Sequence, residues 1–295
     1  MAASAVAVLA GAALLRRQPA PVLADQGDAS LRDAVADEPQ ITEAQKRTIE
    51  QLTSVFENGT PEFQYSYIED IGDGAGPTVG RIGFTGGELA LLVGRYVVRK
   101  NSATPLAAYL SCLEQKGSAI MTDYACLYPS LTRSQMADPQ FKARGIAEVD
   151  FGKAWAEAGA DPVMREIQDA YVEKTYYEQA ITEFRDMHLR TALALAFIYD
   201  TVVQMDEIHQ IERYAQTQFA AKHHGLVAPR TEDEEIEWLR FFQIERARIL
   251  PKTASGGTAP RVESLNQILD ARNTSLTGTI RFSYVDGPVT LDGRE

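Results

Sequence analysis

The sequence is short of cysteine, of histidine and of long apolar runs, and each shortage excludes a class of protein. Its 295 residues include two cysteines, Cys112 and Cys126, and two thiols alone cannot form a structural zinc site. The pair could form one disulfide or remain as buried free thiols. The histidines form no HExxH motif, so core or surface roles are favoured over metal ligation for all four of them: His188, His209, His223 and His224.

Positive charge is also in short supply. The chain carries 29 lysines and arginines against 41 aspartates and glutamates, which gives a formal net charge of −12. A negative field of this kind repels nucleic acid and anionic lipid and attracts polycations. An acidic surface that serves only solubility is the alternative. The overall balance, 45% hydrophobic and 24% charged, is that of a folded globular protein and not of a disordered or fibrous one.

The first apolar run, residues 5–15, is too short to span a membrane but fits the hydrophobic region of a secretory signal. It is followed by VLA, a small-residue pattern that fits signal cleavage. We therefore expect residues 1–24 to be a signal segment, residues 25–40 to be a flexible linker, and the mature chain to be secreted, either extracellular or periplasmic. Because the basic pair Arg16-Arg17 follows the apolar run instead of preceding it, an upstream start or an uncleaved anchor is the alternative.

Apolar residues recur at helical spacing over most of the remaining chain, which predicts a mainly α fold. A glycine-rich stretch around residues 71–84 interrupts the helices and predicts a turn or a small β-hairpin. A capping box, Thr231 with Glu234, predicts the start of a late helix. The expected helices cover residues 42–57, 61–70, 88–99, 105–115, 151–158, 161–185, 188–212 and 231–250.

Two charged residues occupy positions that the apolar pattern assigns to the core. Arg246 falls on the apolar face of the expected helix at 231–250, and Asp200 lies within the apolar sequence LALAFIYDTVV. A buried charge requires a partner, so the economical prediction is an ion pair between these two residues. The alternative is that both lie partly exposed at helix edges.

Two carboxylates stand out by their surroundings. Glu57 falls in the last turn of an expected helix, where the negative end of the helix dipole disfavours the ionised form and should raise its pKa. Asp73 lies between two glycines in the stretch YSYIEDIGDGAGPTVGRIGF, next to Glu69 and Asp70. Two acids in unlike environments are what glycoside hydrolysis requires, one protonated and one ionised. An acidic surface turn is the alternative.

Other motifs for chemistry are missing. The glycines after Asp73 lack the third glycine of a dinucleotide fingerprint, and no GxxxxGK[ST] occurs, which argues against phosphate binding. Residues 70–81 fail as a calcium loop, because glycines and an arginine occupy ligand positions. No GxSxG motif indicates a serine hydrolase.

The pattern EN-x(6)-YxYIEDIGDGxGxTxGxIGF, which begins at Glu57, resembles the family-46 glycoside hydrolases. These are chitosanases, which cut β-1,4 bonds in partially deacetylated chitin. The resemblance implies a mainly α, lysozyme-like fold of two lobes, with a small β-hairpin element and a substrate cleft between the lobes. Residues 41–295 would then form a single catalytic domain. It further implies an endo-acting, inverting single displacement, with Glu57 as general acid, Asp73 as general base and Thr78 helping to hold the attacking water.

The resemblance also assigns supporting residues and partners. Arg261 would pair with Asp73, while Asp200 and Arg246 would support the cleft. The expected partner is the polycation chitosan, with no nucleic acid, no membrane after processing, no metal or organic cofactor, and a monomeric state. Substrate-binding positions are matched by Asn58, Tyr67, Glu88 and Tyr176.

The sequence departs from the family pattern in the glycine-rich turn, where Ala75 and Pro77 replace the usual arginine and tyrosine. Two other functions therefore stay open. One is a lysozyme-like enzyme that cleaves peptidoglycan, and the other is a chitosan-binding protein with impaired catalysis.

Overall fold

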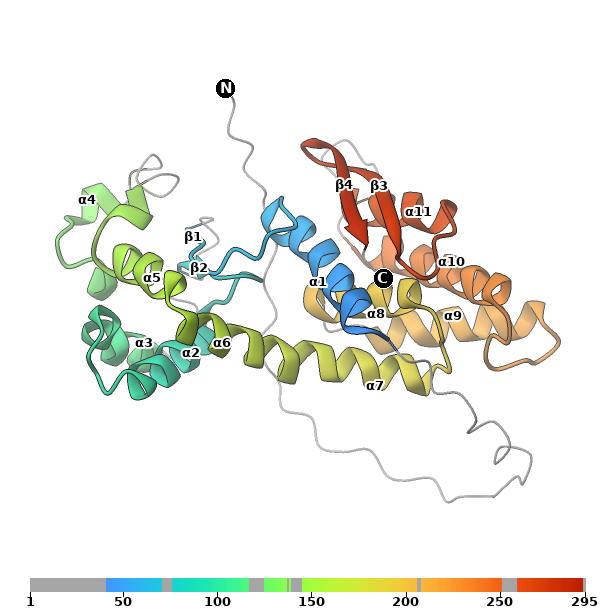
Figure 1. Ribbon diagram of the computed structural model, residues 1–295, viewed down its shortest axis with the longest axis horizontal. Coiled ribbons are helices and arrows are strands. Elements are labelled where there is room, and N and C mark those ends of the chain that lie inside the picture. The colour runs from blue at the N-terminus through green and yellow to red at the C-terminus, as the bar shows by residue number, and fades with distance from the viewer. Residues whose placement is uncertain are drawn as a thin grey trace, which may run out of the picture. The chain divides into compact units, whose positions relative to one another are not determined.

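The computed structural model describes residues 41–70, 76–116, 125–136, 138, 145–205, 208–250 and 259–293 (Figure 1). Over this part of the chain the fold is mainly helical, with two short antiparallel pairs of strands, which confirms the expected class. Among the described helices, none combines the length and apolar character needed to cross a membrane. The expected signal segment and linker at residues 1–40 lie outside the described residues.

The described chain divides into two compact units. The first contains Gln51–Gln179, and the second contains Ala180–Glu295 together with the residues up to Glu50. The chain passes from one unit to the other inside two helices, α1 (Glu43–Asn58) and α7 (Glu178–Asp186).

The first unit contains the end of α1, a small β element and a set of helices whose apolar faces form its core. Phe56, Leu92, Trp155 and Met164 are among its fully buried side chains. Its elements after α1 are β1 (Ile68–Glu69), β2 (Thr78–Val79), α2 (Gly86–Arg99), η2 (Pro105–Tyr109), α3 (Leu110–Lys116), η3 (Ala125–Leu127), α4 (Arg133–Met136), η5 (Ile146–Glu148), α5 (Asp150–Ala160), α6 (Pro162–Val172) and the π-helical turn η6 (Glu173–Tyr177). A disulfide between Cys112 and Cys126 joins α3 to η3, which settles the two alternatives left by the sequence.

The glycine-rich stretch forms the predicted small β element in part. Strands β1 and β2 pair antiparallel, with Ile68 opposite Val79, and Val79 also exchanges backbone hydrogen bonds with Phe84 across a tight turn. Gly80 lies in this turn at φ +73, and a Cβ there would meet the Phe84 ring at 2.8 Å. Glycine is required at this position by both backbone and space. Asp73 lies outside the described residues.

The prediction of a helix at residues 61–70 is wrong, because these residues form turns that lead into β1. Their carbonyl groups bond to other parts of the unit instead of to a helix of their own. The Tyr65 carbonyl accepts from Gln168 Nε2 at 3.0 Å, and the Tyr67 carbonyl accepts from Trp155 Nε1 and from the Gly80 amide, both at 2.9 Å. Tertiary hydrogen bonds thus override the local helical pattern.

The second unit is built on α8 (Ala192–Gln204), whose residues from Ala192 to Val202 are all buried. Its other elements are α9 (Ile208–Lys222), α10 (Glu232–Ile249), α11 (Pro260–Asp270), β3 (Gly278–Tyr284) and β4 (Gly287–Gly293). Figure 1 shows β3 and β4 as a hairpin beside α11. The capping box of Thr231 and Glu234 is present at the start of α10, as predicted.

Two expected helices need correction, and one strand pair was not expected. Residues 161–185, expected to form a single helix, are divided among α6, the π turn η6 and α7. The helix expected at 188–212 is likewise replaced by two helices, α8 and α9. The split falls after Gln204, because Met205 has an extended backbone (φ −159) that no helix can include. The C-terminal hairpin was not predicted, although Asp286-Gly287 between alternating residues is a hairpin signal.

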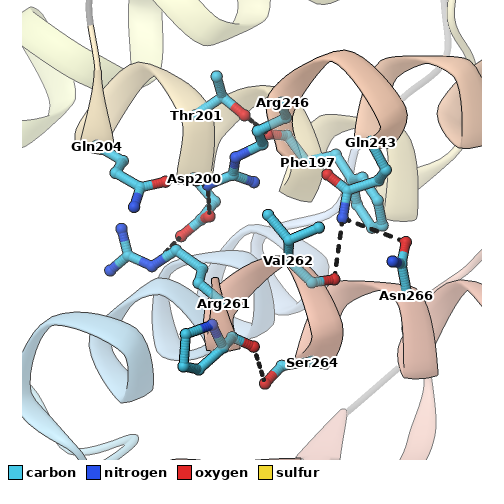
Figure 2. A network of polar contacts seen from close by, with 11 residues as sticks. Phe197, Asp200, Thr201, Gln204, Gln243, Arg246, Arg261, Val262, Ser264 and Asn266 are labelled. Carbon is cyan, nitrogen blue, oxygen red and sulfur yellow. Dashed lines mark hydrogen bonds and ion pairs between the residues drawn. The ribbon is translucent and has the colours of Figure 1, made fainter. Parts of the chain in front are cut away.

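A buried ion pair joins helices of the second unit (Figure 2). Arg246 of α10 and Asp200 of α8 are fully buried, and Arg246 Nη2 lies 2.5 Å from Asp200 Oδ2. The same nitrogen donates to Gln204 Oε1 at 2.5 Å. Arg261 of α11 places its Nε 3.8 Å from the other carboxylate oxygen of Asp200. The predicted pair is confirmed, and it connects three helices.

Replacing Arg246 with methionine should destabilise the protein strongly, because it leaves the Asp200 carboxylate with one partner fewer in a dry interior. We expect Arg246→Met to lower the free energy of unfolding by about 3–5 kcal/mol, measured by urea denaturation. The control is Arg240→Met, which removes an exposed pair with Asp270 and should cost less than about 1 kcal/mol. Equal losses in the two variants would contradict the assignment.

Candidate active site

Glu57 is placed by the last turn of α1, whose apolar side is fixed in the core. Leu52, Val55 and Phe56 on this helix are each at most 1% exposed, whereas Glu57 is half-buried. The last turn carries no basic residue that would neutralise the helix end. A carboxylate at the negative end of a helix is less readily ionised, which suits a proton donor.

The charge of Glu57 acts on two tyrosines. Burial is the main cause of the raised pKa of Tyr67, followed by its hydrogen bond to Glu69 and by the charges of Glu69 and Glu57. Burial and the contact with Glu88 likewise raise the pKa of Tyr176, with a smaller contribution from Glu57. Both phenols therefore stay neutral and remain hydrogen-bond donors at any physiological pH.

Glu88 is held by two phenol hydroxyls. It lies in the first turn of α2. Its Oε1 accepts hydrogen bonds from Tyr171 at 2.8 Å and from Tyr176 at 2.7 Å. Burial, then the charge of Glu88, raises the pKa of Tyr171 to about 12.

The π-helical turn η6 explains how both tyrosines reach the same oxygen. Tyr171 and Tyr176 are five residues apart, which in a regular α-helix would place them about 140° apart around the axis. In η6 the Glu178 amide bonds to the Glu173 carbonyl, five residues back, so side chains at this spacing come to one side. Tyr171 was not predicted as a site residue, because a five-residue spacing is not a helical signal in sequence.

Thr78 and Asn58 lie in the same unit but differ in their surroundings. Thr78 of β2 is 6% exposed, and its hydroxyl has no hydrogen-bond partner within the described chain. Asn58 uses its side-chain amide to donate to the Arg81 carbonyl at 2.6 Å. Asn58 thus holds the turn after β2, a structural contact that the sequence did not predict.

The first unit brings together many of the predicted site residues. Glu57, Tyr67, Glu88 and Tyr176 form one electrostatically coupled group, joined by Tyr171. The three residues predicted to support the site belong to the second unit, where they form the buried network of Figure 2: Asp200, Arg246 and Arg261. Since Asp73 is outside the described residues, its pairing with Arg261 stays a prediction.

The group in the first unit combines proton donors with carboxylates. Tyr67 donates to Glu69, and Glu69 and Glu88 bring further negative charge to the group that contains Glu57. Carboxylates gathered in this way attract cationic groups. The arrangement can therefore bind an amine.

Comparisons with known proteins agree with this chemistry. The model of glycosyl hydrolase family 46 matches residues 51–150 and 143–280. A chitosanase from Bacillus subtilis (strain 168) is 32% identical over 247 residues, which cover 80% of this chain and 80% of that relative.

Solved structures give the same result. The native chitosanase of Bacillus subtilis MY002 superposes with a TM-score of 0.65 at 28% identity, covering 86% of this chain and all of that one (100%). A family-46 chitosanase from Gynuella sunshinyii, in complex with chitotetraose, has a TM-score of 0.63 at 27% identity, with 86% and 100% covered. These structures have the lysozyme-like fold that the sequence implied. On the match of sequence over both units and of structure over most of its length, the chain belongs to glycosyl hydrolase family 46.

Proposed function

We propose that this glycoside hydrolase is an endo-acting chitosanase that cleaves β-1,4 glucosaminidic bonds by single displacement with inversion. The observation that carries the proposal is the coupled group around Glu57, where a half-buried helix-end carboxyl adjoins neutral phenols and further carboxylates. Solved relatives support the substrate, since a mutant chitosanase from Bacillus subtilis MY002, with a TM-score of 0.64, is described as complexed with 6 GlcN.

Glu57 is the general acid in this scheme. It gives its proton to the glycosidic oxygen as the bond to the leaving sugar breaks. The end of α1, which carries no basic residue in its last turn, favours its protonated form.

Asp73 is the general base, and Thr78 helps to hold the attacking water. The Thr78 hydroxyl is buried without a protein partner in the described chain, and such a group costs about 1–3 kcal/mol unless a water or substrate completes its hydrogen bonds. For inversion, the Glu57 and Asp73 carboxyls must stand about 6.5 Å apart or more to admit that water. Arg261 would keep Asp73 ionised.

Glu88 binds the ammonium group of a glucosamine unit. Both tyrosines donate to its Oε1, which fixes the carboxylate and leaves Oε2 to face a cation. The net charge of −12 attracts the protonated polymer over longer range. We further propose that the protein is exported and acts as a monomer.

The function is tested by incubating the protein with soluble chitosan and, separately, with bacterial cell walls. We expect new reducing ends from chitosan and little loss of cell-wall turbidity. Proton NMR of the early products should show the α-anomer first, because a single displacement inverts the β configuration. Turbidity loss without chitosan cleavage would indicate a peptidoglycan-cleaving enzyme, and binding without products would indicate an inactive chitosan-binding protein.

Glu57→Gln should lower the rate of chitosan hydrolysis by about 100- to 10,000-fold, because the amide cannot deliver the proton. Its thermal unfolding should stay close to that of the parent, since the shape of the side chain is kept. Glu166→Gln, on an exposed residue of the same unit, is the matched control and should keep full activity. If Glu57→Gln remained nearly as active as this control, another residue would have to be the acid.

Glu88→Gln should raise KM for chitosan by about 10-fold, equivalent to about 1.4 kcal/mol, while kcat changes little. The reason is the loss of a charge that contacts substrate in both the ground state and the transition state. The difference from wild type should shrink as salt is raised, because salt screens the attraction. A loss confined to kcat, with KM unchanged, would rule out a role in ammonium binding.

A further inference from the structure

The second unit contains a group of ionisable side chains that the proposed reaction does not use. It consists of Glu183 on α7 and of His209 and Glu212 on α9, and one ligand atom of each lies within 4.8 Å of the other two. His209 Nδ1 is 3.3 Å from Glu212 Oε2 and 3.6 Å from Glu183 Oε2. The imidazole therefore lies between two carboxylates.

Helix geometry produces this arrangement. His209 and Glu212 are three residues apart on α9, a spacing that puts their side chains on the same face. Glu183 comes from the part of α7 that belongs to the same unit. This group could not be predicted from the sequence, because the three residues form no contiguous motif and α8 separates Glu183 from the other two along the chain.

Burial of the Glu212 carboxylate has a free-energy cost that its neighbours in the group do not fully offset. Its side chain is 3% exposed, and although Oε2 faces His209, Oε1 is buried without a hydrogen-bond partner in the described part of the chain. An ionised carboxylate in that state loses its hydration without full compensation. A cation bound to this carboxylate would offset its charge.

The electrostatics of the group call for positive charge. The negative charges of Glu183 and Asp186 act on Glu212, and His209 opposes them. Asp186 also adds negative charge beside Glu183. His209 is 60% exposed, so its own charge, when present, is largely screened by water.

We propose that Glu183, His209 and Glu212 bind a divalent transition-metal cation of the zinc type, which ties α7 to α9. One imidazole and two carboxylates are a ligand set that zinc accepts. Tetrahedral ligands at about 2.0–2.2 Å from zinc lie about 3.3–3.6 Å from one another. The two distances from His209 Nδ1, 3.3 and 3.6 Å, fall in that range before any rearrangement.

The exposed side of His209 leaves room for a water molecule as fourth ligand, and the second imidazole nitrogen can donate to solvent. The role is structural, because the cation would offset the charges of the two carboxylates and link helices that α8 separates in sequence. The cation would bind the folded chain and not the unfolded one, so it should stabilise the fold.

The test uses the full chain without a polyhistidine tag, treated with a chelator and then dialysed. At pH 7.5, excess zinc chloride should raise Tm by roughly 5–10 °C, and calorimetric titration should find one zinc ion per chain. Magnesium chloride should shift Tm far less, since magnesium prefers oxygen ligands in octahedral geometry.

Two variants locate the effect. His209→Ala and Glu212→Gln should each abolish most of the zinc-dependent shift, whereas His224→Ala, on an exposed histidine of the same unit, should keep it. Without zinc, Glu212→Gln should unfold at or above the wild-type Tm, because it removes a buried charge, so its loss of response cannot be attributed to misfolding. Wild type that ignores zinc, or a His209→Ala protein that responds like wild type, would overturn the proposal.

Discussion

The pairing of buried carboxylates is the constraint on which this structure depends. An acid removed from water must be neutralised, hydrogen-bonded or matched by a positive charge, and the chain uses a different solution at each place. Asp200 is fully buried and has Arg246 and Arg261 as partners. Because these partners come from α10 and α11, the requirement of one carboxylate determines how three helices of the second unit meet.

Glu88 shows a second solution, in which neutral phenols take the place of arginines. Two hydroxyls orient its Oε1 but do not cancel its charge. This difference separates structure from function within the same protein. A carboxylate paired with guanidinium groups has little left to offer a ligand, whereas one held by phenols keeps a negative charge that a cationic ligand could use, as we propose for Glu88.

The sequence predicted those features that follow from short-range pattern. The ion pair was predicted from the positions of Arg246 on an apolar helix face and of Asp200 in an apolar run. The start of α10 was predicted from the capping box of Thr231 and Glu234. It failed where distant groups decide the backbone. The helix expected at 61–70 gave way to hydrogen bonds from Gln168 and Trp155, which no local pattern contains. Tyr171 was missed for a related reason, because the turn that aligns it with Tyr176 departs from α-helical geometry.

The π turn η6 also has a consequence for chain length. It lies between α6 and α7, and Tyr176 within it faces Glu88 only because the helix is locally wider there. Removing one residue between Glu173 and Tyr177 would let the backbone return to ordinary α-helical bonding, at little expense to the helix itself. The same deletion would rotate the phenol away from the carboxylate, so selection for the contact between Tyr176 and Glu88, and not for helix stability, is what would preserve that extra residue over evolution.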